Sequence, residues 1–138
     1  MDTIRILLVD DHQVVREGLR RMLELEPDFE VVGETGTAKD VLDQVETLSP
    51  EVILMDIKMP GIDGIELTRQ IKVKSPAANV IMLTLYDEYL AQAIEAGAKG
   101  YLVKDINREE LLKAIRAVHE GRSPINLSLT QDQLAKLT

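Results

Sequence analysis

The sequence contains no cysteine and few aromatic residues, and each of these absences excludes a class of site. Without cysteine there is neither a disulfide framework nor a thiolate metal site. Aromatic residues make up 3% of the 138 residues, so stacking platforms for bases or sugars are not expected. The chain also lacks a long apolar run and a signal-like N-terminus. We therefore expect a soluble, cytoplasmic protein with no membrane partner.

A basic stripe is also missing, and the formal net charge is -8. Phosphate contacts need clustered lysine and arginine, so nucleic acid is not expected as a direct partner of this segment. What the sequence does contain is 45% hydrophobic and 29% charged residues. That composition is enough for one sizeable core, and we expect a single globular domain.

Five short apolar runs predict the strands of a buried parallel sheet. Each run is largely apolar rather than alternating, which is typical of strands whose sheet is covered by helices on both faces. The runs comprise residues 4–9, 31–33, 52–55, 80–83 and 101–103. Segments with helical apolar spacing follow them, at about residues 12–26, 37–48, 64–74, 87–96 and 107–121. This alternation predicts an α/β fold, a (βα)5 doubly wound five-stranded parallel sheet.

Polar side chains follow four of these runs at the point where each strand should end. Asp10 and Asp11 follow the first run, Asp56 the third, Thr84 the fourth and Lys104 the fifth. In sheets of this type, ligands bind beyond the carboxyl ends of the strands. We therefore expect the five side chains to meet at one edge of the sheet and to form the functional site.

Three carboxylates at one edge cannot all stay ionised without a cation between them. Oxygen ligands without histidine or cysteine select a hard ion, and a site with few protein oxygens suits Mg²⁺ better than Ca²⁺. Mg²⁺ beside a carboxylate, with a lysine and a threonine facing it, matches what phosphoryl transfer requires. On this interpretation Asp56 is the nucleophile and forms an aspartyl-phosphate.

Each of these residues, taken alone, has a simpler interpretation. Asp10 and Asp11 could cap the first helix. Asp56 lies shortly before a Met-Pro-Gly sequence and could belong to a turn. Thr84 alone is typical of a cap or a strand, and Lys104 could form a structural ion pair with one aspartate. The metal-site interpretation depends on all five residues together.

Four sequence motifs resemble those of the response-regulator receiver domain. They are VDDH at 9–12, MDIKMPGIDG at 55–64, LT at 83–84 and GYLVKD at 100–105. Each motif alone is weak, but their order, spacing and placement on successive strands are together specific. The resemblance covers residues 4 to about 122. It implies a flavodoxin-like sheet with strand order 2-1-3-4-5.

The resemblance implies a phosphoacceptor site. By it, Asp56 receives a phosphoryl group from the phosphohistidine of a sensor histidine kinase. Asp11 would ligate Mg²⁺ directly, Asp10 largely through water, and Lys58 through its backbone carbonyl. The chain would then be a signalling switch rather than an enzyme, although it would take part in its own phosphorylation and dephosphorylation.

The resemblance also implies how the site signals. Thr84 and Lys104 would contact the phosphoryl oxygens, and Tyr101 occupies the aromatic switch position that turns inward when Thr84 moves. The simpler interpretation of Tyr101 is a half-buried packing residue. The surface near the fourth helix, fifth strand and fifth helix would change partners, and a homodimer could form on phosphorylation. Tyr86 and Lys58 lie where the family tunes hydrolysis of its aspartyl-phosphate.

The sequence around the fifth strand and helix most resembles the receivers of NarL/FixJ/LuxR-type transcriptional regulators. We expect residues 1–122 to form the receiver. Residues 123–138 would be a linker or tail, or the start of a helix-turn-helix output domain missing from this chain, and DNA would be bound only through that domain. Asp105 stands where proline often follows the lysine, which leaves open whether the Lys104–Asp105 peptide bond is cis.

Other functions stay open on the sequence alone. A haloacid-dehalogenase-type phosphatase uses similar groups, but its usual nucleophile lies in a D-x-D motif after the first strand and it commonly needs a cap domain. This chain has adjacent Asp10 and Asp11 instead. A stand-alone receiver could act through protein contacts. A flavin-binding electron carrier on the same fold is disfavoured, because a Thr/Ser-rich phosphate loop is missing after the first strand.

Overall fold

A six-stranded parallel sheet forms the centre of the computed structural model, which describes residues 3–59, 61, 63–104 and 107–126. The strands are β1 (Ile4–Val9), β2 (Phe29–Thr35), β3 (Val52–Met55), β4 (Asn79–Thr84), β5 (Gly100–Val103) and β6 (Ile125–Asn126). The helices are α1 (Gln13–Glu24), α2 (Ala38–Leu48), α3 (Gly64–Lys74), α4 (Leu90–Ala96) and α5 (Arg108–His119). Within these described ranges, no helix is long and apolar enough to cross a membrane.

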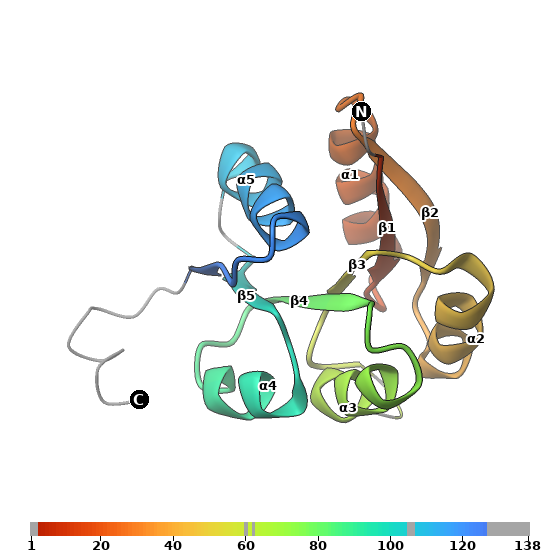
Figure 1. Cartoon of the computed structure of the whole chain (residues 1–138), viewed down its shortest axis with the longest axis vertical. Helices are drawn as coiled ribbons and strands as arrows, with labels where there is room; N and C mark the ends of the chain where they lie inside the picture. Colours follow the sequence, from red (N-terminus) through yellow and green to blue (C-terminus); the bar gives the residue numbers. More distant parts are fainter. Residues whose placement is uncertain (1–2, 60, 62, 105–106, 127–138) are drawn as a thin grey trace.

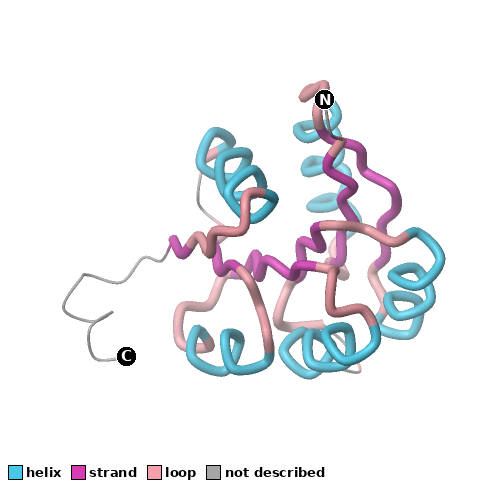
Figure 2. The backbone as a smooth tube through the Cα atoms, viewed as in Figure 1, coloured by secondary structure: helices cyan, strands magenta, loops and turns pink. Residues whose placement is uncertain are grey.

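Helices cover both faces of the sheet, with α1 and α5 on one face and α2, α3 and α4 on the other (Figure 1). Figure 2 shows the same arrangement as a tube in which strands and helices alternate along the chain. Successive residues of β3 point to opposite faces, so Ile53 and Met55 pack in the core under α2 to α4, while Val52 and Leu54 pack under α1 and α5. Burial on both faces explains why this strand is apolar throughout.

The strand order is β2-β1-β3-β4-β5-β6, so the predicted doubly wound sheet with order 2-1-3-4-5 is confirmed. The short sixth strand was not predicted. Its residues, Ile125 and Asn126, lie in a segment expected to be a linker, and a two-residue pairing leaves no apolar pattern to detect. Tyr101 N donates to Pro124 O at 3.0 Å, which holds this segment beside β5.

The element boundaries differ most from the prediction at β2 and α4. β2 is longer than the predicted run of residues 31–33. The prediction was too short because Glu30 and Glu34 interrupt the apolar pattern of the strand. It can carry these polar side chains because it is an edge strand and is only partly covered. α4 begins at Leu90, three residues after the predicted start.

The helix caps explain where several helices begin and end. The Asn107 side chain accepts from Glu110 N at 2.8 Å and caps α5. Gly97 ends α4 with a φ of 107°, a left-handed conformation that favours glycine. Thr37 is the N-cap of α2, but its hydroxyl donates to Asp40 Oδ2 at 3.0 Å instead of accepting a backbone N–H. Thr37 therefore occupies the N-cap position without making the side-chain cap bond.

Candidate functional site

The carboxyl ends of β1, β3, β4 and β5 meet at one edge of the sheet. The register pairs Val9 with Met55, so the residues that follow β1 and β3 are neighbours. Backbone hydrogen bonds continue beyond the strands: Asp56 N donates to Val9 O at 3.0 Å, and Lys104 N donates to Thr84 O at 2.7 Å. The parallel pairing thus carries the predicted polar residues to a common edge.

Four charged residues at this edge form what we call the site cluster: Asp10, Asp11, Asp56 and Lys104. Lys104 Nζ donates to Asp10 Oδ2 at 2.7 Å and to Asp56 Oδ2 at 3.1 Å. The exposed fractions of the three side chains are 14% for Lys104, 5% for Asp10 and 6% for Asp56. Lys104 therefore bridges two nearly buried carboxylates, whereas a simple structural ion pair would need only one.

The ionisation of the bridged groups is set by two opposing effects. Burial acts to raise the pKa of Asp10, but the hydrogen bonds from Lys104 and from the His12 backbone outweigh it and hold this pKa below its usual value. Burial likewise acts to lower the pKa of Lys104, and its bonds to Asp10 and Asp56 raise it above the usual value. Both Asp10 and Lys104 are therefore charged at neutral pH.

The acidic side chains are spaced closely enough to share one cation. One ligand atom from each of Asp10, Asp11, His12 and Asp56 lies within 4.8 Å of the others. Asp11 Oδ1 is buried and makes no hydrogen bond with the rest of the described chain, so it is available as a ligand. A set of carboxylate oxygens suits a hard divalent ion, and the residues present fit Mg²⁺. The role of the Lys58 carbonyl stays a prediction.

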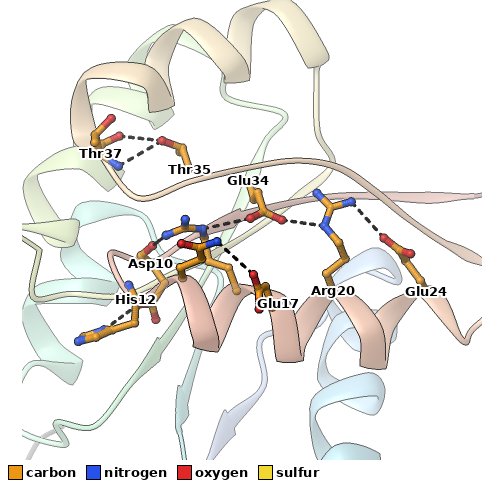
Figure 3. Close-up of polar contacts among 10 residues, drawn as sticks. Asp10, His12, Glu17, Arg20, Glu24, Glu34, Thr35 and Thr37 are labelled. Carbon is orange, nitrogen blue, oxygen red and sulfur yellow. Dashed lines mark hydrogen bonds and ion pairs between the residues drawn. The ribbon is translucent and has the colours of Figure 1, made fainter.

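His12 also belongs to this group, although the sequence assigned it no role. It is the N-cap of α1, and its Nδ1 atom lies 3.0 Å from Asp10 Oδ1 and 3.1 Å from Asp11 Oδ1. Figure 3 shows the His12 ring beside Asp10. The His12 backbone N–H also donates to Asp10 Oδ1 at 2.9 Å. Asp10 therefore bonds the backbone at the N-cap of α1 and also faces Lys104, and its role as a metal ligand stays a prediction.

An arginine on α1 fixes the backbone of Asp10. Arg16 Nη1 donates to Asp10 O at 2.6 Å, and Arg16 Nε donates to Glu34 Oε1 at 3.3 Å. Arg20 Nε donates to the other oxygen of Glu34 at 2.7 Å, and Figure 3 shows this row of pairs continuing to Glu24. Because Glu34 lies on β2, the contacts of Arg16 could not be found from local sequence.

The start of α3 packs directly against the backbone of Asp56. A Cβ atom on Gly64 would lie 2.2 Å from Asp56 O, so only glycine fits this position. Gly64 N donates to Ile57 O at 2.7 Å, and Asp63 caps the helix by accepting from Glu66 N at 2.7 Å. The segment after Asp56 is thereby held tightly to the first turn of α3.

Thr84 and Tyr101 both bond to the backbone of Tyr86. Thr84 Oγ1 accepts from Tyr86 N at 3.3 Å, and the Tyr101 hydroxyl donates to Tyr86 O. Tyr101 is fully buried, so its ring already lies inward and is not half-buried. Burial also raises the pKa of its hydroxyl. Among the contacts of the described residues, the Thr84 hydroxyl faces Tyr86 and no carboxylate.

The two positions expected to tune hydrolysis of an aspartyl-phosphate lie near each other. Lys58 Nζ is 5.9 Å from the centre of the Tyr86 ring and 4.8 Å from the centre of the Tyr89 ring. The segment after β3 therefore contacts the segment after β4 through its side chains. Asp105 lies outside the described residues, so the peptide bond between Lys104 and Asp105 is not described either.

Comparison with known proteins gives a family match over most of the chain. The model of the response regulator receiver domain matches residues 6–116. The transcriptional regulatory protein DegU of Brevibacillus brevis is 37% identical over 131 residues, which cover 94% of this chain and 56% of DegU. The transcriptional regulatory protein LiaR of Bacillus subtilis (strain 168) is 41% identical over 136 residues, which cover 97% of this chain and 64% of LiaR.

A solved structure agrees with the sequence relatives. The crystal structure of a LuxR-family two-component response regulator from Aurantimonas sp. SI85-9A1 matches with a TM-score of 0.87 and 36% identity, covering 99% of this chain and 96% of that chain. This chain spans less than two thirds of the length of DegU and of LiaR. The fold, the acidic edge of the sheet and the family match agree, and they favour a receiver over the phosphatase and flavin-carrier alternatives. The chain belongs to the family of response regulator receiver domains of two-component signalling, among relatives that are transcriptional regulators.

Proposed function

We propose that Asp56 is the phosphoacceptor of this receiver. A carboxylate oxygen of Asp56 would attack the phosphorus of a phosphohistidine on a sensor histidine kinase. The P–N bond would break, and its electron pair would return to the imidazole. One observation carries the proposal: Lys104 bridges Asp56 and Asp10 at the carboxyl edge of the sheet, and among the described residues it is the one lysine that pairs with any of the three aspartates.

Mg²⁺ would be held by Asp10, Asp11, Asp56 and the backbone carbonyl of Lys58. When bound, it would neutralise charge on the phosphoryl oxygens, which is the main requirement of phosphoryl transfer. Lys104 already lies 3.1 Å from Asp56 Oδ2 and would contact an oxygen of the phosphoryl group formed there. The receiver would in this way take part in its own phosphorylation and dephosphorylation while remaining a switch.

The signal would leave the site through Tyr86. The Thr84 hydroxyl accepts from the Tyr86 amide, and the Tyr101 hydroxyl donates to the Tyr86 carbonyl. A new bond from the Thr84 hydroxyl to a phosphoryl oxygen would break its bond to the Tyr86 amide. Population shift requires such a difference in contacts between the two states. The affected surface would comprise α4, β5 and α5. Ile94 on α4 and Leu85 in the segment between β4 and α4 are exposed apolar side chains near it.

The experiment that tests the phosphoacceptor is incubation with a small phosphodonor and Mg²⁺, followed by intact mass measurement. The wild type should gain one acid-labile phosphoryl group, and Asp56→Asn should gain none. Asp63→Asn is the matched control, because asparagine can keep the N-cap of α3 and Asp63 has no part in the proposed chemistry. Undiminished labelling of the Asp56→Asn protein would refute the assignment.

The same phosphorylated samples test the switch. The NMR signals of the Tyr101 ring should shift on phosphorylation of the wild type, because the Tyr86 carbonyl that it contacts would move. In Thr84→Ala the phosphoryl group should still be found by mass, but the Tyr101 signals should change little. Equal Tyr101 shifts in both proteins would show that Thr84 does not couple the site to this ring.

We also propose that this receiver, residues 1–122, works within a transcription regulator. DegU and LiaR are transcriptional regulatory proteins, and this chain matches a part of each. DNA binding would then come from a helix-turn-helix output domain beyond the linker of residues 123–138, and phosphorylation would promote a homodimer. Light scattering of the regulator with and without phosphodonor tests the dimer, and an unchanged mass would contradict it.

A further inference from the structure

His12 lies among the acidic side chains, and the proposed function gives it no task. We propose that His12 Nδ1 is an additional ligand of the divalent cation and makes this site prefer Ni²⁺, Co²⁺ and Zn²⁺ over Mg²⁺. The proposal rests on the proposed function for the location of the site. It is tested on metal binding alone, so the two can fail separately.

The spacing of the atoms is that of neighbouring ligands around one ion. His12 Nδ1 lies 3.0 Å from Asp10 Oδ1 and 3.1 Å from Asp11 Oδ1. In an octahedral site with metal–ligand distances of about 2.1 Å, neighbouring ligand atoms are about 3.0 Å apart. A cation can therefore contact these three atoms together without moving their side chains far.

Hydrogen bonding alone does not account for the arrangement. A neutral imidazole carries one N–H, so Nδ1 can donate to only one of the two carboxylates that it approaches equally. Asp11 Oδ1 makes no hydrogen bond within the described part of the chain although it is buried. A cation bound by Nδ1 and by both Oδ1 atoms would satisfy all three groups.

The two oxygens of Asp10 face two different partners. Oδ2 accepts from Lys104 at 2.7 Å, and Oδ1 faces His12. The His12 backbone N–H donates to the same Oδ1 atom at 2.9 Å and places the ring next to the carboxylates. The side chain of His12 is 65% exposed, so this side of the group borders solvent. Substitution of the ring leaves the backbone bond in place.

The nitrogen ligand changes which ions bind best. Imidazole is a good ligand for Ni²⁺ and Zn²⁺, whereas Mg²⁺ prefers oxygen ligands and water. Loss of His12 should therefore weaken the binding of the first group and leave Mg²⁺ binding nearly unchanged. The same residue would make the receiver sensitive to competition between Mg²⁺ and these ions.

The test is calorimetric titration of protein without an affinity tag with Ni²⁺, Zn²⁺ and Mg²⁺. His12→Gln should bind Ni²⁺ and Zn²⁺ at least about 10-fold more weakly than the wild type, the scale of loss seen when even outer partners of metal ligands are removed. Its Mg²⁺ affinity should stay within a few-fold. His119→Gln is the matched control, because His119 is the second of the two histidines of the chain and lies on α5 beside Glu51.

Nitrogen NMR of the imidazole rings supplies a direct readout of coordination. Zn²⁺ should shift the His12 Nδ1 signal and leave the signals of His119 nearly in place. Equal Ni²⁺ affinity in His12→Gln and the wild type, or an unshifted His12 Nδ1 signal in saturating Zn²⁺, would overturn the proposal. Failure of the proposed function has a different signature, namely absence of a phosphoryl group on Asp56 whatever His12 does.

Discussion

Two clusters of charged residues in this protein differ in their balance of acidic and basic side chains. The site cluster lies at the carboxyl edge of the sheet, and a second cluster joins α5 to the segment between α1 and β2. The second group, which we call the α5 cluster, consists of Glu26, Asp28, Arg108 and Arg116. The α5 cluster has two acids and two arginines, whereas the site cluster has three acids and one lysine.

The α5 cluster has the features of a structural contact. Arg116 donates to Asp28 at 2.8 and 3.0 Å and to Glu26 at 2.8 Å, and its guanidinium lies 4.7 Å from the centre of the Phe29 ring. The Arg116 side chain is 37% exposed, so water screens these pairs. Because its charges balance, this cluster needs no further ion.

The site cluster is more buried and is not balanced. Asp10 and Asp56 are almost covered, and Lys104 alone lies between them. Such an arrangement contributes little net stability, because removing the charges from water costs about as much as their attraction returns. The comparison teaches that excess buried charge, rather than the number of ion pairs, distinguishes a site from a contact.

The largest expected difference between the clusters is the loss of stability when the lysine of one or the central arginine of the other is replaced. In the absence of divalent ions, Lys104→Met should lower the free energy of unfolding by about 3 kcal/mol, because two nearly buried carboxylates would lose their counter-charge. Arg116→Met should cost about 1 kcal/mol or less, since its pairs are partly exposed and water screens them. Urea denaturation measures both values. Equal costs for the two variants would break the comparison.

A smaller effect is expected on the titration of Asp10. Its pKa in the folded protein lies below the ordinary 3.8, so its contribution to stability is present above that pH and is lost as the pH falls through the folded-state pKa. In Lys104→Met, burial would act without the lysine and the pKa of Asp10 should rise. Carbon NMR of the carboxyl carbons follows this titration. A pKa of Asp10 that stays below 3.8 in this variant would contradict the role of Lys104.

The carboxyls of the α5 cluster serve as internal controls for that titration. Hydrogen bonds from Arg116 hold the pKa values of Glu26 and Asp28 below their usual values, although burial acts weakly in the opposite direction. These values should be the same in the wild type and in Lys104→Met. A change in all of these carboxyls would indicate a general loss of structure rather than a local effect.

The central fold could be predicted from sequence because its strands are buried on both faces. β3 is apolar throughout and β1 is apolar except for Arg5, and the predicted boundaries of both match the structure. The edge elements were harder, because β2 carries exposed polar residues and β6 has only two residues. Apolar periodicity reports burial, and it fades where burial is partial.

The site could be predicted in part for a related reason. Parallel strands end at one edge, so the approach of Asp10, Asp56 and Lys104 follows from their places in the sequence. The contacts of His12 and Arg16 depend on side-chain directions after the chain has turned into α1, and no sequence spacing specifies them.

The most direct test of the account is the location of a bound divalent cation in solution. Mn²⁺ can replace Mg²⁺ at oxygen sites, and its paramagnetism broadens the NMR signals of nearby nuclei. Small amounts of Mn²⁺ should broaden the backbone signals of Asp10, Asp11 and Asp56, with no effect at the α5 cluster, and excess Mg²⁺ should reverse the broadening. Broadening centred on Glu26 and Asp28, or spread evenly over acidic surfaces, would contradict a single cation site beside Asp56.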